Sequence, residues 1–332
     1  MGGLSFDGLI RRPEAGAFLG MFFIFVFFFI FGGHNFVSLQ GAASWLNVAA
    51  NLGIIAVPIG FLMIAGELDI SIGAMIPGAS MCMGIASGYY ELPIMVGVAI
   101  TLTFAVIVGF INGWIVIRTA VPSLIVTMGT LFAVAGLTLF LSIVLTRTTA
   151  VSLKSPDWAK AIFGSFMFGS GYQVMIVWWL ALSALYIYGL HYSPWGNWIY
   201  ALGGDKNSAR NAGIPTDKLT IGLFVLSSVS AAFIGLCQTI LFNSAQVSSG
   251  MSFIFNSIIA VVVGGVLLTG GFGSVIGIFF GTITFAMVNQ GIYFTDFDRN
   301  LSSLIIGVML LLAVFMNNTF RQMALTYTPK KK

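Results

Sequence analysis

Residues 93–117 read PIMVGVAITLTFAVIVGFINGWIVI, and this stretch decides the fold class. It contains no charged side chain, and the nearest charges are Glu91 and Arg118. An α-helix needs about 20 mostly apolar residues to cross a bilayer. A strand of a membrane β-barrel alternates apolar and polar residues instead, which this stretch does not do. The stretch therefore predicts a membrane-spanning helix.

The composition extends this prediction to the whole chain. Of the 332 residues 58% are hydrophobic and 7% are charged, and the mean hydropathy is +1.01. An ordinary soluble domain is about 25% charged and needs those residues for its surface. A soluble enzyme, a nucleic-acid binder and a disordered chain are therefore excluded. We predict an all-α integral membrane protein, a polytopic helical bundle in the lipid bilayer with no nucleic-acid partner.

Apolar segments follow one another along the chain and predict about ten transmembrane helices. Turns at 66–71 and 270–273 interrupt longer apolar stretches, so some helices are expected to be short or broken. Because ten spans leave room for short loops only, residues 1–332 are expected to form a single transmembrane domain. The segments cover approximately 15–32, 44–66, 70–88, 93–117, 123–145, 172–191, 218–241, 253–270, 272–291 and 301–317.

The basic residues predict how this bundle is oriented in the membrane. Cytoplasmic loops of membrane proteins carry an excess of Lys and Arg. An even number of spans puts both termini on one side, and a cytoplasmic position for them leaves ten basic residues inside and four outside. The sequence therefore predicts a cytoplasmic N-terminus at 1–14, a cytoplasmic loop at 192–217 and a basic cytoplasmic tail at 318–332.

The loop at 192–217 contains a short predicted helix. Asp205 suits a helix N-cap, Gly213 suits a left-handed helix end, and Pro215 prevents continuation. A helix of about two turns is unstable alone, so either a partner protein docks on it or it is a capped, solvated loop. The candidate docking residues are Asp205, Lys206, Asn207, Ser208, Ala209, Arg210, Gly213 and Ile214.

A second polar segment, 66–73, reads GELDISIG and stands between two apolar segments. Carboxylates are costly at membrane depth. Asp69 is interpreted as a cap for the next helix, helped by Ser71. The alternative is a proton or ion site.

Amide side chains inside the predicted spans are candidates for a solute pathway. Such side chains either join helices by hydrogen bonds or line an aqueous path. Amides both donate and accept, so they would suit a solute rich in hydroxyl groups. The candidates are Asn47, Asn51, Asn112, Asn256, Asn289 and Gln290.

A glycine-rich stretch, 263–273, reads VGGVLLTGGFG and permits close packing and sharp bends. It is not a phosphate loop, because the pattern GxxxxGK[ST] is absent from the whole chain. No cofactor and no metal site are predicted on this chain, since no Cys or His cluster is present. The glycines Gly73, Gly264, Gly265, Gly270, Gly271 and Gly273 are expected to have structural roles.

Three of these motifs together resemble the permease subunits of bacterial ABC sugar importers of the ribose, xylose, arabinose and autoinducer-2 type. Residues 68–73 (LDISIG) resemble the family's D-L-S-V-G segment. Residues 203–214 resemble its G-G-N-x-x-A-A-R-x-x-G-I segment. Residues 260–274 resemble its A-A-V-V-L-G-G-T-S-L-x-G-G-x-G segment. The order and spacing agree, and the likeness extends over roughly residues 40–317.

The resemblance implies an assembly in the bacterial inner membrane. Two permease subunits, identical or different, would form a pathway for a monosaccharide or polyol that works by alternating access. An ABC ATPase, either a two-domain chain or a pair, would bind ATP and Mg²⁺ on the cytoplasmic side. A periplasmic sugar-binding protein would deliver the solute. The chain itself would be a transport subunit rather than an enzyme, with 192–217 as its ATPase-coupling loop.

The sequence departs from the family pattern at Glu67, at 253–257 and at 266–268, which leaves the solute open. An alternative function is a stand-alone secondary transporter or channel for a small polar solute, in which Asp69 would take part in ion coupling. A membrane-embedded enzyme is disfavoured, because the two histidines stand alone and no acids cluster inside the predicted spans.

Overall fold

A computed structural model describes residues 13–167, 170–248 and 250–298, together with residues 304, 307–308, 311–312 and 315. Apart from those isolated residues, the predicted tenth span at 301–317 lies outside the described residues. The predicted basic tail at 318–332 lies outside them altogether.

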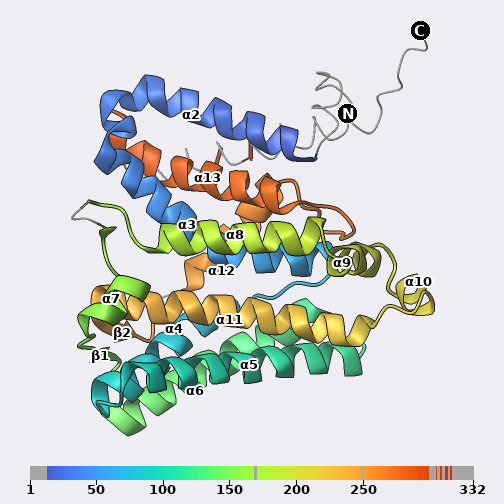
Figure 1. Ribbon diagram of the computed structural model, residues 1–332, viewed down its shortest axis with the longest axis horizontal. Coiled ribbons are helices and arrows are strands. Elements are labelled where there is room, and N and C mark those ends of the chain that lie inside the picture. The colour runs from blue at the N-terminus through green and yellow to red at the C-terminus, as the bar shows by residue number, and fades with distance from the viewer. Residues whose placement is uncertain are drawn as a thin grey trace.

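Long apolar helices run roughly along the longest axis of the molecule (Figure 1). Six helices in the described part of the chain are long and apolar enough to cross a membrane, and a bent pair, α8–α9, makes a seventh candidate. The all-α membrane class is thus confirmed, whereas ten spans are not. The six are α2 (Pro13–Val37), α3 (Leu39–Ile64), α5 (Ile94–Arg118), α6 (Ser123–Thr146), α11 (Thr216–Phe242) and α13 (Val275–Gly291, followed by the 3-10 turn η3, Ile292–Phe294).

Two of the predicted spans are short helices in the structure. The third segment is α4 (Ile72–Met83) followed by a π-helical turn η1 (Gly84–Tyr89). The eighth, predicted to reach residue 270, is α12 (Met251–Val263) and ends seven residues earlier. The helix ends there because Gly265 adopts a left-handed backbone, with φ of +92°, and the chain then forms a loop until α13.

The predicted inner loop at 192–217 begins with a helix rather than a loop. α8 (Met175–His191) is followed after two residues by α9 (Pro194–Gly204), and the two helices differ in direction by 70°. Pro194 stands in the first turn of α9, where its missing N–H costs nothing. α10 (Lys206–Asn211) comes next, separated from α9 by Asp205 alone.

A small cap lies at the opposite end of the molecule from α10 (Figure 1). Strands β1 (Ala150–Ser152) and β2 (Ser244–Gln246) pair antiparallel, with Val151 opposite Ala245. The short helix α7 (Asp157–Phe163) also belongs to this end. This two-stranded sheet and an isolated antiparallel bridge between Phe166 and Gln173 are the β-structure within the described residues.

Helix α3 forms the centre of the core. From Ala49 to Ile64 nearly every residue is buried, whereas α2, α5 and α6 expose many large apolar side chains, as lipid-facing helices do. Gly53 lets the indole of Trp179 on α8 lie directly against the backbone of α3. The same indole stacks on Phe279 of α13, with ring centroids 4.3 Å apart. Three helices are thereby held together around one buried tryptophan.

Candidate functional site

A cavity of about 210 Å³ lies between α3, the segment before α8, α11, α12 and α13. It is smaller than a typical drug-sized pocket of about 300 Å³ or more, so it suits a small solute. Five of its lining side chains are amides, and among the described lining residues none is charged. We call it the amide cavity. It is lined by Asn47, Val48, Asn51, Leu52, Gln173, Gln238, Phe253, Asn256 and Phe285.

One wall of the amide cavity is fixed by hydrogen bonds. The Asn47 side chain donates to the Gly171 carbonyl (2.8 Å) and accepts from the Gln173 backbone N–H (2.9 Å). Asn51 donates to the Asn47 carbonyl (2.8 Å) and to the Gln173 side-chain oxygen (2.9 Å). The three bonds to Gly171 and Gln173 tie α3 to a segment more than 120 residues away in the sequence.

The lining of the amide cavity also offers unused hydrogen-bonding groups. Gln238 of α11 and Asn256 of α12 make no hydrogen bond with any described residue. Each carries an amide that both donates and accepts, and Phe253 and Phe285 add apolar ring surface to the lining. The cavity therefore presents the mixture of apolar surface and a few oriented polar groups that is typical of small-molecule sites.

The structure brings together three of the six predicted pathway amides, namely Asn47, Asn51 and Asn256. Asn289 and Gln290 do not line the amide cavity, and Gln290 donates to Asn289 (2.9 Å). Sequence reasoning missed Gln173 and Gln238. Both lie inside predicted spans, at 172–191 and 218–241, so the rule that selected the other amides would have found them.

The sixth predicted amide, Asn112, belongs to a separate buried group around Asp69. Asn112 donates to the Ser71 hydroxyl (3.0 Å) and accepts from Thr130 (2.6 Å). Asp69 accepts from the backbone N–H and the hydroxyl of Ser71 (2.9 and 2.5 Å) and from Ser227 (2.8 Å). This network of side-chain hydrogen bonds joins the start of α4 to α5, α6 and α11.

The expected cap before α4 takes a different form from the prediction. Ser71 directly precedes the helix and makes no side-chain capping bond. Its hydroxyl donates to Asp69 instead, and the Asp69 carboxylate satisfies the backbone N–H of Ser71. Asp69 is 2% exposed, and all three of its hydrogen bonds come from serines.

Helix α10 has the two ends that the sequence indicates. The Asp205 carboxylate accepts from the backbone N–H of Ser208 (2.6 Å), and this hydrogen bond lowers the pKa of Asp205 below its ordinary value. At the other end Gly213 has φ of +85°, and the Ile214 N–H bonds to the Ala209 carbonyl (3.1 Å). A carboxyl with a lowered pKa keeps its charge, and therefore its cap, as the pH falls through the ordinary range of aspartate titration.

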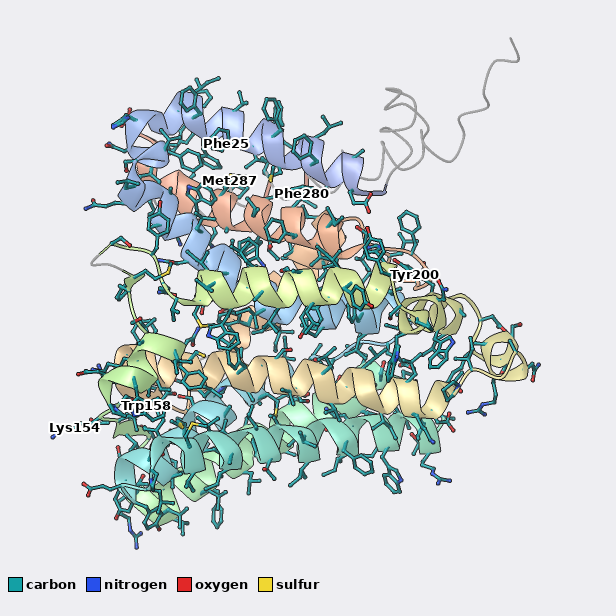
Figure 2. All side chains as sticks on the ribbon, in the orientation of Figure 1. Phe25, Lys154, Trp158, Tyr200, Phe280 and Met287 are labelled. Carbon is teal, nitrogen blue, oxygen red and sulfur yellow. The ribbon has the colours of Figure 1, made fainter. Side chains whose placement is uncertain are left out.

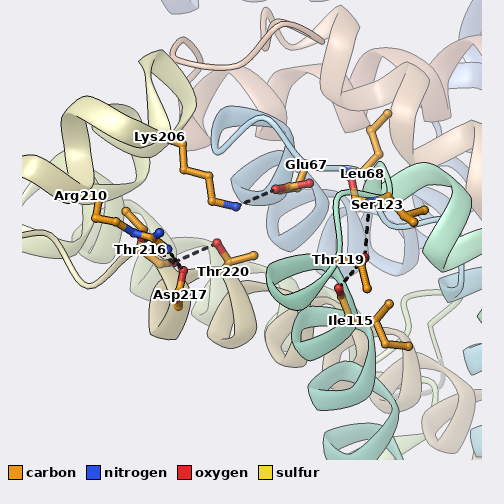
Figure 3. Close-up of polar contacts among 11 residues, drawn as sticks. Glu67, Leu68, Ile115, Thr119, Ser123, Lys206, Arg210, Thr216, Asp217 and Thr220 are labelled. Carbon is orange, nitrogen blue, oxygen red and sulfur yellow. Dashed lines mark hydrogen bonds and ion pairs between the residues drawn. The ribbon is translucent and has the colours of Figure 1, made fainter.

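Side chains of α10 tie it to the rest of the molecule (Figure 3). Arg210 pairs with Asp217 and donates to Thr216 (3.3 Å) at the start of α11. The Lys206 Nζ atom lies 3.8 Å from Oε1 of Glu67, in the turn after α3. Ala209 is buried, and the exposed residues of the helix include Asn207, Ser208 and Asn211.

The predicted structural glycines lie at close backbone approaches. A Cβ on Gly73 would stand 2.6 Å from Ile254 Cγ1, so α4 and α12 pack closely there. A Cβ on Gly264 would stand 2.7 Å from the Gly277 carbonyl oxygen of α13. Gly265 ends α12, as described above, and Gly270, Gly271 and Gly273 shape the loop that follows it.

Comparison with known protein families identifies the family to which this chain belongs. The sequence profile of the branched-chain amino acid transport system permease component family matches residues 41–314. The chain belongs to this family. The match includes the amide cavity, the group around Asp69 and helix α10. The likeness to transport permeases that the three motifs carry is thus confirmed, and this permease is a multi-pass protein of the bacterial inner membrane.

Several curated proteins are similar to this permease over most of both chains. It is 27% identical to the fructose import permease protein FrcC of Rhizobium meliloti over 320 residues, which cover 95% of this chain and 88% of that one. It is 29% identical to the ribose import permease protein RbsC of Haemophilus influenzae over 290 residues, or 86% and 87%. It is 28% identical to the autoinducer 2 import system permease protein LsrD of Photorhabdus luminescens over 264 residues, or 79% and 78%.

Proposed function

We propose that this permease imports a monosaccharide or related polyol across the bacterial inner membrane as a subunit of an ABC transporter. The amide cavity carries the proposal. Its free amides suit hydroxyl groups, and its described lining has no charge to pair with the ammonium and carboxylate groups of an amino acid. The family description mentions branched-chain amino acids, but fructose and ribose appear in the names of similar proteins.

The proposed assembly contains partners for each step. A second permease subunit completes the pathway, and a periplasmic sugar-binding protein delivers the solute. An ABC ATPase, two-domain or paired, binds ATP and Mg²⁺ and docks on α10, with Asp205, Lys206 and Arg210 holding that helix in place. ATP-driven movement of α10 then switches the pathway between outward and inward access.

The proposed orientation puts α10 and both termini in the cytoplasm. The end of α5, the start of α6, α10 and the start of α11 lie in one neighbourhood (Figure 3). This end carries Arg118, Lys206, Arg210 and Lys218. Lys154 lies at the other end of the molecule from Tyr200 of α9 (Figure 2). The excess of basic residues near α10 supports a cytoplasmic position, and ten spans follow if residues 301–317 add a helix and α4 and α12 each count as one.

Replacing Asn256 with leucine tests the amide cavity. Leucine keeps the branched shape and the number of non-hydrogen side-chain atoms but removes an amide available to solute, so uptake of radiolabelled fructose or ribose should fall about tenfold, the equivalent of one net hydrogen bond of about 1.4 kcal/mol. The measurement uses cells in which this permease is the sole copy. Asn289→Leu is the matched control, because Asn289 lies outside the cavity. Equal uptake by the two variants would contradict a solute site at Asn256.

Replacing Asn207 with tryptophan tests docking on α10. The Asn207 side chain is exposed, so an indole there should leave the fold intact and block a protein surface that packs on the helix. We expect an ABC ATPase to co-purify with the unsubstituted permease in mild detergent and to be lost from Asn207→Trp. Lys154→Trp places the same bulk at the opposite end of the molecule and should retain the ATPase. Purification of the unsubstituted chain alone, under conditions that preserve a known ABC complex, would favour the stand-alone transporter.

A further inference from the structure

Three backbone segments meet where α9 ends, at four glycines that we call the glycine junction: Gly66, Gly203, Gly270 and Gly271. The Gly271 N–H donates to the Ile64 carbonyl (2.8 Å) at the end of α3. A Cβ on Gly203 would overlap that same carbonyl oxygen and stand 2.6 Å from the Gly271 nitrogen. A Cβ on Gly270 would lie 2.9 Å from the Gly203 oxygen and 3.1 Å from Gly66. The segments therefore touch backbone to backbone, with no side chain between them.

Helix α10 is joined firmly to this junction. Asp205 alone separates α10 from Gly204, the last residue of α9. The Tyr200 hydroxyl, one turn earlier on α9, donates to the Gly273 carbonyl in the loop before α13 (2.7 Å). The Lys206–Glu67 pair adds a contact with the turn after α3. A displacement of α10 thus reaches the turn after α3 and the loop after α12 directly.

The other side of the junction leads to the amide cavity. Asn51 and Asn256 lie on α3 and α12, and both helices end at the segments that form the junction. At 1.5 Å per residue, Asn51 is about 20 Å from the end of α3, and Asn256 is about 10 Å from the end of α12. Rigid helices transmit movement over such lengths because packed interiors do not deform continuously.

We propose that the glycine junction transmits movement of α10 to the amide cavity, with Gly203 as its positioning residue. The proposal rests on the proposed function, in which α10 docks an ATPase. A side chain at Gly203 would separate α9 from Ile64 and Gly271, and α10 would then move without moving α3 and α12. The lack of a side chain is what keeps the three backbones in contact.

Adjacent glycines provide a matched pair of variants. Gly203→Ala adds a methyl group that overlaps backbone atoms, whereas a Cβ on Gly204 meets no atom within 4 Å. The first measurement is hydrogen exchange of the purified chain in nanodiscs. Gly203→Ala should speed exchange of the Gly271 N–H at least about fivefold through local opening, and Gly204→Ala should leave it unchanged. Unchanged exchange in Gly203→Ala would show that the backbones are not held together there and would overturn the proposal.

The second measurement follows the cavity in the complete transporter. Cys82 and Cys237 are replaced by serine, and Asn256→Cys then reports on the cavity through its rate of modification by a membrane-impermeant maleimide. Mg·ATP with orthovanadate should change this rate at least about fivefold, the lower end of typical coupling between sites. Gly203→Ala should abolish the change while the ATPase stays bound, and Gly204→Ala should retain it. A full response in Gly203→Ala would overturn the proposal. If no ATPase is bound to the permease that retains Gly203, the proposed function is contradicted. The inference about the glycine junction, which rests on that function, is then contradicted as well.

Tyr200→Phe is a milder variant that tests the same junction even where Gly203→Ala does not fold. Tyr200→Phe removes the hydrogen bond to Gly273 but keeps the ring, and should reduce the nucleotide response of the Asn256→Cys reporter. Tyr192→Phe removes a hydroxyl from a tyrosine that is 75% exposed and should retain the full response. Equal responses in the two tyrosine variants would contradict a role for the contact between α9 and the loop before α13.

Discussion

Replacing Asp69 with alanine is expected to lower the free energy of unfolding by about 3 kcal/mol, because buried donors lose their acceptor. The side chain is 2% exposed, and it accepts from the Ser71 N–H, the Ser71 hydroxyl and the Ser227 hydroxyl. The Ser227 hydroxyl can turn toward a carbonyl oxygen of its own helix, but the backbone N–H of Ser71 has no such freedom. Thermal unfolding of the detergent-purified protein, followed by tryptophan fluorescence, measures the change.

Two neighbouring serines on α11 make the control for Asp69. Ser227 donates to Asp69, whereas the buried Ser228 hydroxyl has no hydrogen-bond partner among the described residues. Ser227→Ala should therefore destabilise the protein, though less than Asp69→Ala does. Ser228→Ala should be neutral or slightly stabilising, since it removes an unsatisfied polar group. Equal melting temperatures for the two serine variants would mean that the bond to Asp69 contributes nothing to stability.

Substitution of Asp69 also distinguishes the two candidate transport mechanisms, ATP-driven import and gradient-driven transport. In a gradient-driven transporter an intramembrane carboxylate exchanges a proton or ion during each cycle. Asp69 is instead surrounded by serine donors that join α4 to α11. We expect Asp69→Asn to change stability and uptake together. A normally folded Asp69→Asn protein whose uptake no longer responds to a proton or sodium gradient would favour the stand-alone transporter.

Hydropathy predicts the long helices of this fold well and its short helices poorly. Segments such as 93–117 lie in long helices that expose much of their surface, and their apolar length alone identifies them. Residues 253–270 are just as apolar, yet α12 ends at Val263 and the remainder is a loop, of which residues 264–266 are buried in the protein. Hydropathy does not distinguish contact with lipid from burial in protein. The glycines at 264 and 265 were the available signal, because a left-handed glycine ends a helix.

The site was only partly predictable, because the role of an amide depends on its partners. Asn112 and Asn256 look alike in sequence, since both stand in apolar runs. Thr130 and Ser71 satisfy Asn112, whereas Asn256 faces a cavity. The contact between Asn51 and Gln173 links residues 122 positions apart, which no local pattern shows. The α10 helix was more accessible to prediction, because its Asp205 cap and Gly213 end are local signals.

Replacing Gly53 with alanine is expected to cost about 1–3 kcal/mol of stability, because an extra methyl group overpacks the core. A Cβ there would overlap the indole nitrogen of Trp179 and lie 2.6 Å from its Cδ1. The indole has little room to retreat, since it is 1% exposed and stacked on Phe279. Gly53 is two residues from Asn51, and Trp179 is six residues from Gln173. A shift between α3 and α8 should therefore also disturb the Asn51–Gln173 bond and reduce uptake.

A double substitution separates this steric clash with Trp179 from any general effect of the substitution on the stability of helix α3. Trp179→Ala removes the ring atoms that the new methyl group meets, and it sacrifices no hydrogen bond, because the indole N–H has no partner among the described residues. Gly53→Ala combined with Trp179→Ala should then be more stable than the sum of the single effects requires. Gly136→Ala on α6, where a Cβ meets no atom within 4 Å, should instead stabilise its helix by up to about 1 kcal/mol. If Gly53→Ala raised the melting temperature as Gly136→Ala does, the close approach of Trp179 to α3 would not hold these helices in register.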